Sequence, residues 1–412
     1  MLHHPRLVMI SLDAVSSGEL ETLLALPRFA ALRKRGTLVT DVRSVFVSNT
    51  YPAHTSIITG VHPEKHRLTD NHRLPPGSTK EQWRYSRREI KAPTLYDRAA
   101  ERGLSVCSLL YPVTGYAKIR WNIPEVPGPM SVPKRAWTML GAGSPGFILS
   151  ELVRLGWTFR GRGTAGLDDL MTRVAADALL RHKPDLLLLH LIDADTQKHR
   201  FGPQSPEAVH ALERHDKRIG LVLDALRRAG TDRDTAILLF SDHGCLPVRQ
   251  SVDPNEFLED CGYIRRHQGK LAGYDAFFHN AGGSAFLRIY NEAKQAEILQ
   301  AAKRLLDTAY TGRILTDREM RVSGMDGEYA FGIEAADGYS FGKRHLGQHG
   351  YTPEREGYYP FYLAVPAPDA EEADRLAGGT LTGGCITDIC PLAAELLGIP
   401  AWEMDGINRL RR

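Results

Sequence analysis

The chain has 412 residues, of which 42% are hydrophobic, 25% charged and 8% aromatic, and this composition excludes a disordered or fibrous protein. Its 52 Lys and Arg against 49 Asp and Glu leave a formal net charge of +3, which gives no reason to expect a nucleic-acid or membrane-surface protein. Five cysteines are an odd number in a chain too long to need disulfides, so we expect free thiols in a reducing compartment.

The N-terminal residues do not resemble an export signal. The apolar run at residues 7–10 is too short for the core of a signal peptide, and no small-residue cleavage site follows it. Other apolar runs, such as residues 186–189, are far shorter than the roughly 20 residues needed to span a bilayer. We therefore expect a cytoplasmic protein without a membrane span.

Short apolar runs alternate with longer helical patterns along the chain, which is typical of buried parallel strands joined by crossover helices. Strands are predicted over residues 6–12, 104–109, 185–192, 235–241 and 359–365. Helices are predicted over residues 18–26, 27–35 and 389–397, after Thr94, and from Pro206 to the residue before Gly230, with Thr94, Ser205 and Thr387 as caps. The alternation predicts a doubly wound α/β fold whose mostly parallel sheet is flanked by helices.

Two regions break this alternation. Residues 112–165 are dense in Gly and Pro, and residues 250–340 mix short periodic pieces with Gly-rich turns. Long irregular stretches in a compact protein are usually lids or inserted caps, and we predict that role for both. Residues 1–412 are expected to form a single domain enlarged by these insertions.

Potential metal ligands follow three of the predicted strands. Asp13, Asp195 and the pair Asp242-His243 all come just after a strand, at the edge where the loops of a parallel sheet converge. A single Asp at such a place is usually a turn or cap residue, but three favour a site. Asp195 and His199 are four residues apart and could meet one cation on a helical turn. Carboxylate and imidazole together suit zinc and other divalent first-row metals.

Thr50 lies at the start of a short predicted helix, because Pro52 suits a first helical turn. Its hydroxyl either caps that helix or acts as a nucleophile whose pKa is lowered by the helix end and a metal. Which alternative holds depends on whether metal ligands surround the residue.

Five short segments occur in one order along the chain: the strand ending in Asp13; Thr50-Tyr51-Pro52 with residues 59–64 (TGVHPE); Asp195 to His199 with residues 201–203 (FGP); residues 241–244 (SDHG); and residues 347–351 (GQHGY). Together they resemble the nucleotide pyrophosphatase/phosphodiesterase branch of the alkaline phosphatase superfamily. They cover almost the whole chain. The resemblance implies an alkaline phosphatase-like fold with the site at the carboxyl edge of its sheet.

The resemblance also implies a role for each matching residue. One metal would be held by Asp13, Asp242, His243 and the Thr50 oxygen, and the other by Asp195, His199 and His349. Asn71 matches an asparagine that contacts a phosphoryl oxygen, and its alternative role is that of a turn residue. Tyr51 matches an aromatic position that packs on the leaving group or base, and its alternative role is simple packing.

These roles imply hydrolysis of an anionic phosphoester. Such a substrate repels nucleophiles, and two cations about 3.5 to 4 Å apart neutralise it. The resemblance implies two divalent ions, Zn²⁺ or else Mn²⁺, and cleavage of phosphodiester or pyrophosphate bonds in a small nucleotide-like substrate through a covalent threonyl-phosphate on Thr50. The alternatives are a phosphomonoesterase or phosphonate hydrolase of the same superfamily, or a non-catalytic phosphate or nucleotide sensor, which would not need the nucleophile.

Two further features have simpler interpretations. Residues 245–249 read C-x-P-x-R, the sulfatase formylglycine signature, but they follow the last Asp-His pair instead of opening the Thr50 helix, so we expect Cys245 to be unmodified. The basic stretch 62–91, with Arg84, Arg87 and Arg88, lacks a nucleic-acid module and is predicted to be a solvated loop, some of whose charges could attract an anionic substrate. No feature of the sequence predicts the oligomeric state.

Overall fold

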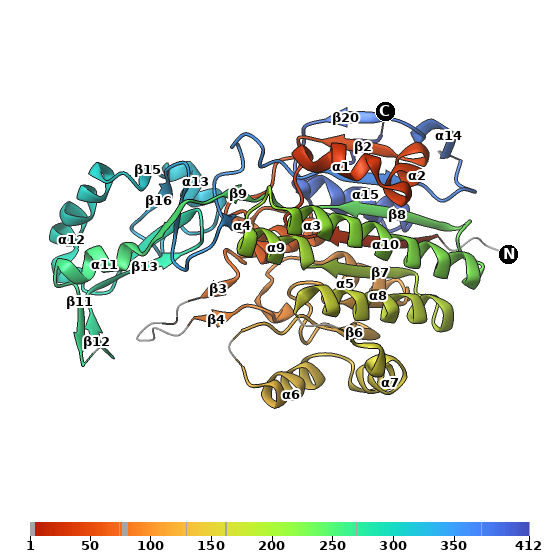
Figure 1. Cartoon of the computed structure of the whole chain (residues 1–412), viewed down its shortest axis with the longest axis horizontal. Helices are drawn as coiled ribbons and strands as arrows, with labels where there is room; N and C mark the ends of the chain where they lie inside the picture. Colours follow the sequence, from red (N-terminus) through yellow and green to blue (C-terminus); the bar gives the residue numbers. More distant parts are fainter. Residues whose placement is uncertain are drawn as a thin grey trace.

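The computed structural model describes residues 5–73, 75, 81–128, 130–160, 163–268, 270–371 and 373–411. Its centre is an eight-stranded sheet with the order β20-β2-β19-β8-β1-β7-β5-β6 (Figure 1). The strands are β1 (Arg6–Leu12), β2 (Thr37–Thr40), β5 (Val106–Leu109), β6 (Trp121–Ile123), β7 (Leu186–Leu191), β8 (Thr235–Phe240), β19 (Tyr362–Val365) and β20 (Thr380–Thr382).

Neighbouring strands of this sheet are parallel except around β19, which runs antiparallel to both β2 and β8. The predicted doubly wound, mostly parallel α/β fold is therefore confirmed. The strand predicted over residues 359–365 begins only at Tyr362. Pro360 has no N–H to donate to a strand ladder, which accounts for the late start.

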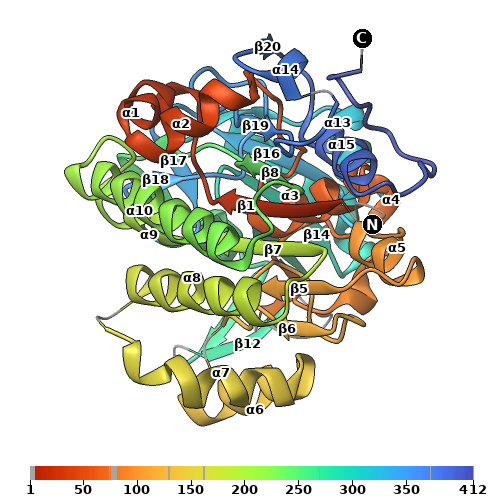
Figure 2. The ribbon, with the colours of Figure 1, turned by 90° about the vertical axis from the view of Figure 1, so that its right-hand side faces the viewer.

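Helices cover both faces of the main sheet (Figure 2). One face carries α1 (Leu20–Ala25), α2 (Pro27–Arg35), α8 (Thr164–Arg181), α9 (Asp193–Phe201) and α10 (Pro206–Ala229), and the other carries α3 (Thr50–Thr59), α5 (Leu95–Glu101) and α15 (Ile389–Leu396). Successive residues of β1 alternate between these two cores, with Val8 and Ile10 in the first and Leu7 and Met9 in the second. The apolar run that looked like a buried strand is therefore covered on both sides.

Two of the three predicted helix caps are present. The Thr94 and Ser205 side chains cap α5 and α10. Thr387 does not cap α15, and that prediction was wrong. A 3-10 turn precedes α15 and contains Thr387, and its capping box is made by Cys385 and Asp388, so the cap lies two residues upstream.

Residues 250–340 form a second lobe, at the left of the main sheet in Figure 1. Its centre is a four-stranded antiparallel sheet of order β13-β14-β16-β15, with a hydrophobic core that includes Phe278 and Leu287. Its elements are β10 (Gln250–Val252), α11 (Pro254–Asp260), β11 (Ile264–His267), β12 (Lys270–Tyr274), β13 (Ala276–Asn280), β14 (Ser284–Ile289), α12 (Gln295–Ala302), β15 (Thr311–Ile314), α13 (Asp317–Val322), β16 (Phe331–Ala335) and β17 (Tyr339–Phe341). The role of this lobe as a cap stays a prediction.

The other irregular region, residues 112–165, contains β6 and the helices α6 (Val132–Ala142) and α7 (Pro145–Leu155). α7 packs against β6 and α8 at the edge of the main sheet. Its predicted role as a lid is likewise untested. Within the described residues, no helix is both long enough and apolar enough to cross a bilayer.

Candidate metal centre

Two groups of potential metal ligands lie at the carboxyl edge of the main sheet. Asp13, Asp242 and His243 form one group, and Asp195, His199 and His349 form the other, with the ligand atoms of each group all within 4.8 Å of one another. The groups adjoin where the ring centroids of His243 and His349 lie 4.3 Å apart. The structure therefore brings together the six carboxylate and imidazole residues that the sequence singled out.

The ends of three neighbouring strands position five of these residues. Asp13 follows β1, and Asp242-His243 follows β8. Asp195 and His199 lie one turn apart on α9, which follows β7, with the His199 Nε2 atom 3.2 Å from Asp195 Oδ1. Asp195 and His199 therefore lie on the helical turn that would let both contact one cation.

His349 reaches the site from the C-terminal part of the chain. It follows the short strand β18 (Gly347–Gln348), which pairs antiparallel with β9 (Leu246–Pro247) just after the Asp242-His243 pair. Two glycines near these strands allow neighbouring backbone segments to approach closely. A Cβ on Gly244 would lie 2.5 Å from the Tyr358 carbonyl oxygen, and one on Gly350, whose φ is 85°, would lie 1.9 Å from that of Ala281.

Thr50 is the first residue of α3, and Asn49 occupies the N-cap position. The Thr50 Oγ1 atom lies 3.4 Å from His243 Nε2, so the hydroxyl faces a ligand group. The N-terminus of α3 also provides a positive electrostatic potential at this hydroxyl. This placement favours the nucleophile over the capping alternative.

The three ligand histidines are oriented by their second ring nitrogens. The Nδ1 atoms of His199 and His243 lie 2.8 and 3.0 Å from the carbonyl oxygens of Gly347 and Gly244, and His349 Nδ1 lies 2.6 Å from Asn49 Oδ1. Each Nδ1 must therefore carry the proton, which leaves Nε2 as a lone-pair donor directed at its group.

The carboxylates leave acceptors unused. Asp13 Oδ1, Asp195 Oδ1 and Asp242 Oδ2 are buried without a hydrogen-bond partner among the described residues. An unpaired buried carboxylate oxygen is costly, and a cation in each group would satisfy these atoms. The donor set, three carboxylates with three correctly oriented imidazoles, therefore fits two divalent cations.

Burial and neighbouring charges shift the pKa values of three of the ligand residues. Burial, and next the charge of Asp242, raise the pKa of Asp13 well above its ordinary value. Burial also opposes ionisation of Asp242, but His243 and His54 hold its pKa below the usual range. Burial, and next His243, lower the pKa of His349 well below its ordinary value, so its ring is neutral, the form that binds metals.

Asn71 lies beside the start of α3, where Tyr51 follows Thr50. The Asn71 Oδ1 atom accepts the Tyr51 backbone N–H at 2.8 Å, which leaves the Asn71 amide N–H groups as donors. Tyr51 is only 1% exposed, and its ring lies 5.4 Å from that of Trp83. Tyr51 therefore packs among protein side chains, and its contact with a substrate stays a prediction.

Sequence reasoning missed a buried link behind the second ligand group. Asp70 Oδ1 accepts from Asn49 Nδ2 at 2.5 Å and from the Asn71 N–H at 2.7 Å, and Asp70 Oδ2 lies 2.6 Å from Nε2 of His279. Because Asn49 also holds His349, a chain of hydrogen bonds joins the second lobe to a ligand. The proximity of Asp70 to Asn71 was the only available signal, and nothing in the sequence pointed to His279.

Three more titratable residues lie behind the first ligand group and were also missed. His54 Nδ1 lies 3.3 Å from Asp242 Oδ2, and His190 Nε2 lies 3.3 Å from Asp13 Oδ2. Glu125, from residues 112–165, lies 4.0 Å from His190 Nδ1, and burial raises its pKa to about 8. The position of His54 four residues after Thr50 could have revealed it, because that spacing places both on one helix face.

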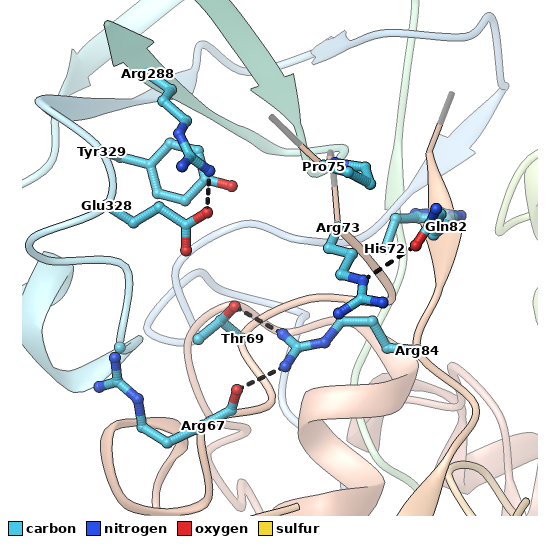
Figure 3. Close-up of a pocket in the computed structure, with 11 residues that line it drawn as sticks. Arg67, Thr69, His72, Arg73, Pro75, Gln82, Arg84, Arg288, Glu328 and Tyr329 are labelled. Atoms are coloured by element: carbon cyan, nitrogen blue, oxygen red, sulfur yellow. Dashed lines mark hydrogen bonds and ion pairs between the residues drawn. The ribbon is translucent and has the colours of Figure 1, made fainter. Parts of the chain in front are cut away.

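A basic pocket of about 510 Å³ lies beside the Asn71 segment (Figure 3). Its lining includes Thr69, His72, Arg67, Arg73, Arg84 and Arg288. Arg84 is held by Glu89, Thr69 and the Arg67 carbonyl oxygen. Arg87 and Arg88, from the same predicted solvated loop, also have local contacts, because Arg87 pairs with Asp97 and the Arg88 guanidinium lies over the Tyr116 ring. Attraction of an anionic substrate by this stretch stays a prediction.

Comparisons with known proteins bear on the family and on the fold. Residues 7–333 match the family model described as type I phosphodiesterase / nucleotide pyrophosphatase. Human ectonucleotide pyrophosphatase/phosphodiesterase family member 1 is 27% identical over 276 residues, which are 65% of this chain and 27% of that protein. The venom phosphodiesterase of Macrovipera lebetinus is 26% identical over 256 residues, which are 62% of this chain and 27% of that protein. The matched part thus spans about a quarter of the length of these curated relatives.

Solved structures show the same fold. An inactive variant of murine ectonucleotide pyrophosphatase/phosphodiesterase 5, in complex with AMP, superposes with a TM-score of 0.71 at 18% sequence identity, over 98% of this chain and 97% of that chain. The human enzyme of the same name gives a TM-score of 0.69 at 18% identity, with 97% of both chains covered. These likenesses confirm the alkaline phosphatase-like α/β fold predicted from the sequence.

Proposed function

Because the chain belongs to the type I phosphodiesterase / nucleotide pyrophosphatase family, we propose that it hydrolyses phosphodiester or pyrophosphate bonds of nucleotide-like substrates with two divalent metal ions and a covalent threonyl-phosphate intermediate. The observation that carries the proposal is the pair of adjoining three-residue ligand groups with the Thr50 hydroxyl beside one of them. A site for binding alone would not need a hydroxyl at that place.

The two ions would be held by this chain's own carboxylates and imidazoles. Asp13, Asp242, His243 and the Thr50 oxygen would hold the first, and Asp195, His199 and His349 the second. When bound, the two cations would neutralise the phosphate and stabilise the attacking and leaving oxygens. This oxygen and nitrogen ligand set suits Zn²⁺, with Mn²⁺ as the alternative.

Thr50 carries the covalent step. Its deprotonated Oγ1 attacks phosphorus in line, so that a Thr–O–P bond forms as the bond to the leaving oxygen breaks. The Asn71 amide donates a hydrogen bond to a phosphoryl oxygen, and the N-terminus of α3 stabilises the added negative charge. Water then displaces Thr50 from phosphorus and releases a phosphomonoester. Two inversions give overall retention of configuration.

The proposal of a nucleotide-like substrate is supported by the similar proteins. One solved neighbour holds AMP, and several curated relatives are phosphodiesterases. Hydrolysis of monoesters or phosphonates is the alternative within the superfamily, and the sensor without catalysis is the alternative outside it.

The test is a panel of phosphodiesters, pyrophosphates, monoesters and phosphonates, assayed with Zn²⁺ and with Mn²⁺. We expect turnover of diesters or pyrophosphates, abolished by Thr50→Ala with intact metal content and partly retained by Thr50→Ser, which keeps a hydroxyl. A sensor would release no product from any substrate. Full turnover by Thr50→Ala, or inversion at a chiral phosphorothioate diester, would overturn the covalent mechanism.

A further inference from the structure

The helices α6 and α7, with the 3-10 turn Gly156–Thr158 that follows α7, carry an apolar surface that no described part of the chain covers. Among the described residues sixteen large apolar side chains are exposed, and seven of them lie between residues 132 and 159. These seven, called here the α6–α7 patch, are Val132, Trp137, Leu149, Leu152, Val153, Trp157 and Phe159. A concentration of this kind marks an interaction surface, because exposed apolar residues are otherwise scattered singly.

The degree of exposure separates this patch from ordinary surface residues. Val132, Val153, Trp137 and Trp157 are 82%, 81%, 75% and 73% exposed, more than any other large apolar side chain among the described residues. In Figures 1 and 2, α6 and α7 form the lower margin of the molecule. The patch therefore lies on a projecting part of the protein.

The sequence of α7 explains how the patch arises. Phe147, Ile148 and Leu155 pack into the core beside the main sheet. Leu149, Leu152 and Val153, spaced i, i+3 and i+4, lie together on another face of the helix and are exposed. An apolar helix face is normally buried against the rest of the protein, and only one of the two apolar faces of α7 is covered.

The exposed charged side chains of residues 130–160 are all basic. Residues 130–160 contain four basic side chains, Lys134, Arg135, Arg154 and Arg160, and a single carboxyl, Glu151, whose side chain is only 2% exposed. Arg154 pairs with Asp177, outside this segment. The surface formed by α6 and α7 is thus apolar with basic side chains around it.

We propose that the α6–α7 patch docks this protein on the surface of a bilayer that contains anionic lipids. Exposed Trp, Leu and Val side chains would enter the interface between headgroups and acyl chains, and the basic side chains would contact lipid phosphates. The binding would be peripheral, since none of the described helices is suited to cross a bilayer.

Charge distinguishes this occupant from a second copy of the chain. A two-fold contact through the patch would place each copy's basic side chains near those of the other, and the exposed residues of 130–160 offer no carboxylate to pair with them. Anionic headgroups supply that missing negative charge. The proposal does not depend on the metal centre, so it can fail or succeed independently of the proposed catalytic function.

Vesicle co-sedimentation tests the proposal. The full chain is mixed with phosphatidylcholine vesicles, or with vesicles in which about a third of the lipid is phosphatidylglycerol. We expect binding to the anionic vesicles with a blue shift of tryptophan emission, and much weaker binding to the neutral ones. The double variant Trp137→Ser, Trp157→Ser should lower the partition coefficient on anionic vesicles by about tenfold or more.

Two further variants separate the components of the interaction. Lys134→Gln with Arg135→Gln should reduce binding to anionic vesicles and make it less sensitive to salt. Ile407→Ser is the matched control, because Ile407 is 63% exposed but lies outside the patch, and it should bind as the parent protein does. The proposal is overturned if the parent protein ignores anionic vesicles, binds neutral ones equally, or binds as well without the two indoles. A dimer that the tryptophan variant abolishes, without vesicle binding, would also overturn it.

Discussion

The candidate metal centre and the α6–α7 patch are two places where side chains lie in surroundings opposite to their chemistry. At the metal centre, the carboxylates of Asp13 and Asp242 are buried with oxygens that have no hydrogen-bond partner among the described residues. At the patch, Trp137 and Val153 face solvent. Under the two proposals, metal ions at the first place and a lipid surface at the second would supply partners from outside the chain. Unsatisfied groups thus mark where function, and not stability, explains the choice of residue.

The two regions differ in what a substitution should do. A buried, crowded charge interacts strongly with everything around it, because the local dielectric constant is low. An exposed apolar side chain contacts little in the protein itself. Changes at the metal centre should therefore have large effects on the isolated protein, and changes at the patch should have almost none until a membrane is present.

Asp242→Asn should have the largest effect. It keeps the shape of the side chain but removes the charge between His243 and His54, and we expect turnover to fall by at least about a thousandfold with loss of bound metal. Asp185→Asn is the matched control, since Asp185 binds Ser105 at the opposite end of β7, and it should retain activity. Steady-state assays with elemental analysis measure both. Undiminished turnover in Asp242→Asn would show that the proposed metal centre is not needed for catalysis.

Asp70→Asn should have an intermediate effect. Asn49 and His279 both donate hydrogen bonds to the Asp70 carboxylate. The amide of an asparagine at position 70 would direct its own N–H groups at one of these donors. Asn49 would then be displaced, and His349, which bonds to Asn49, would lose its support. We expect metal affinity to fall about 10- to 100-fold, with turnover largely recovered at saturating metal. Calorimetric metal titration checks this, with Asp275→Asn in the second lobe as control. Equal affinities in the parent protein and Asp70→Asn would show that the link is only structural.

The pH dependence of stability should reveal the buried carboxyl of Glu151, which lies on α7. Burial raises its pKa from 4.5 to about 7, so between these values the folded state holds a proton that the unfolded state has lost. Stability should therefore fall as pH rises through this window. Glu151→Gln cannot titrate, and the free energy of unfolding of the parent protein relative to this variant should decrease by up to about 2 kcal/mol from pH ~5 to ~8. Denaturant unfolding at several pH values measures it, and parallel curves would contradict it.

The double variant Trp137→Ser, Trp157→Ser should have the smallest effect without lipid. Both indoles are mostly exposed, so the free energy of unfolding should change by less than about 0.5 kcal/mol, and hydrolysis of a soluble diester should not change. Denaturant unfolding and a solution assay provide the check. A loss of more than about 2 kcal/mol would show that the patch belongs to the core and would end the contrast with the metal centre.

Much of the fold and most of the site were predictable because short-range signals determine them. The apolar runs of β1, β7 and β8 are buried on both faces, and an Asp after a parallel strand must lie at the carboxyl edge. The spacing of Asp195 and His199 fits one helical turn. These residues could be placed together without knowledge of the strand order.

The residues that were missed depend on long-range contacts. His279 reaches Asp70 from a lobe whose strands pair only with one another, and no local pattern links residues 209 positions apart. The direction of β19 likewise depends on the strands beside it. The position of the cap before α15 depends on the 3-10 turn that precedes the helix. The patch was missed for another reason: a net charge of +3 averages over the chain and hides a basic, apolar segment. The distribution of charge along the chain, and not the net charge, indicates which partners a surface can bind.

The most direct test of the central claim is an anomalous diffraction map at the zinc edge from crystals of the zinc-loaded protein. We predict two peaks about 3.5 to 4 Å apart, one between Asp13, Asp242 and His243 and the other between Asp195, His199 and His349. A single peak, or none at these residues, would contradict the account.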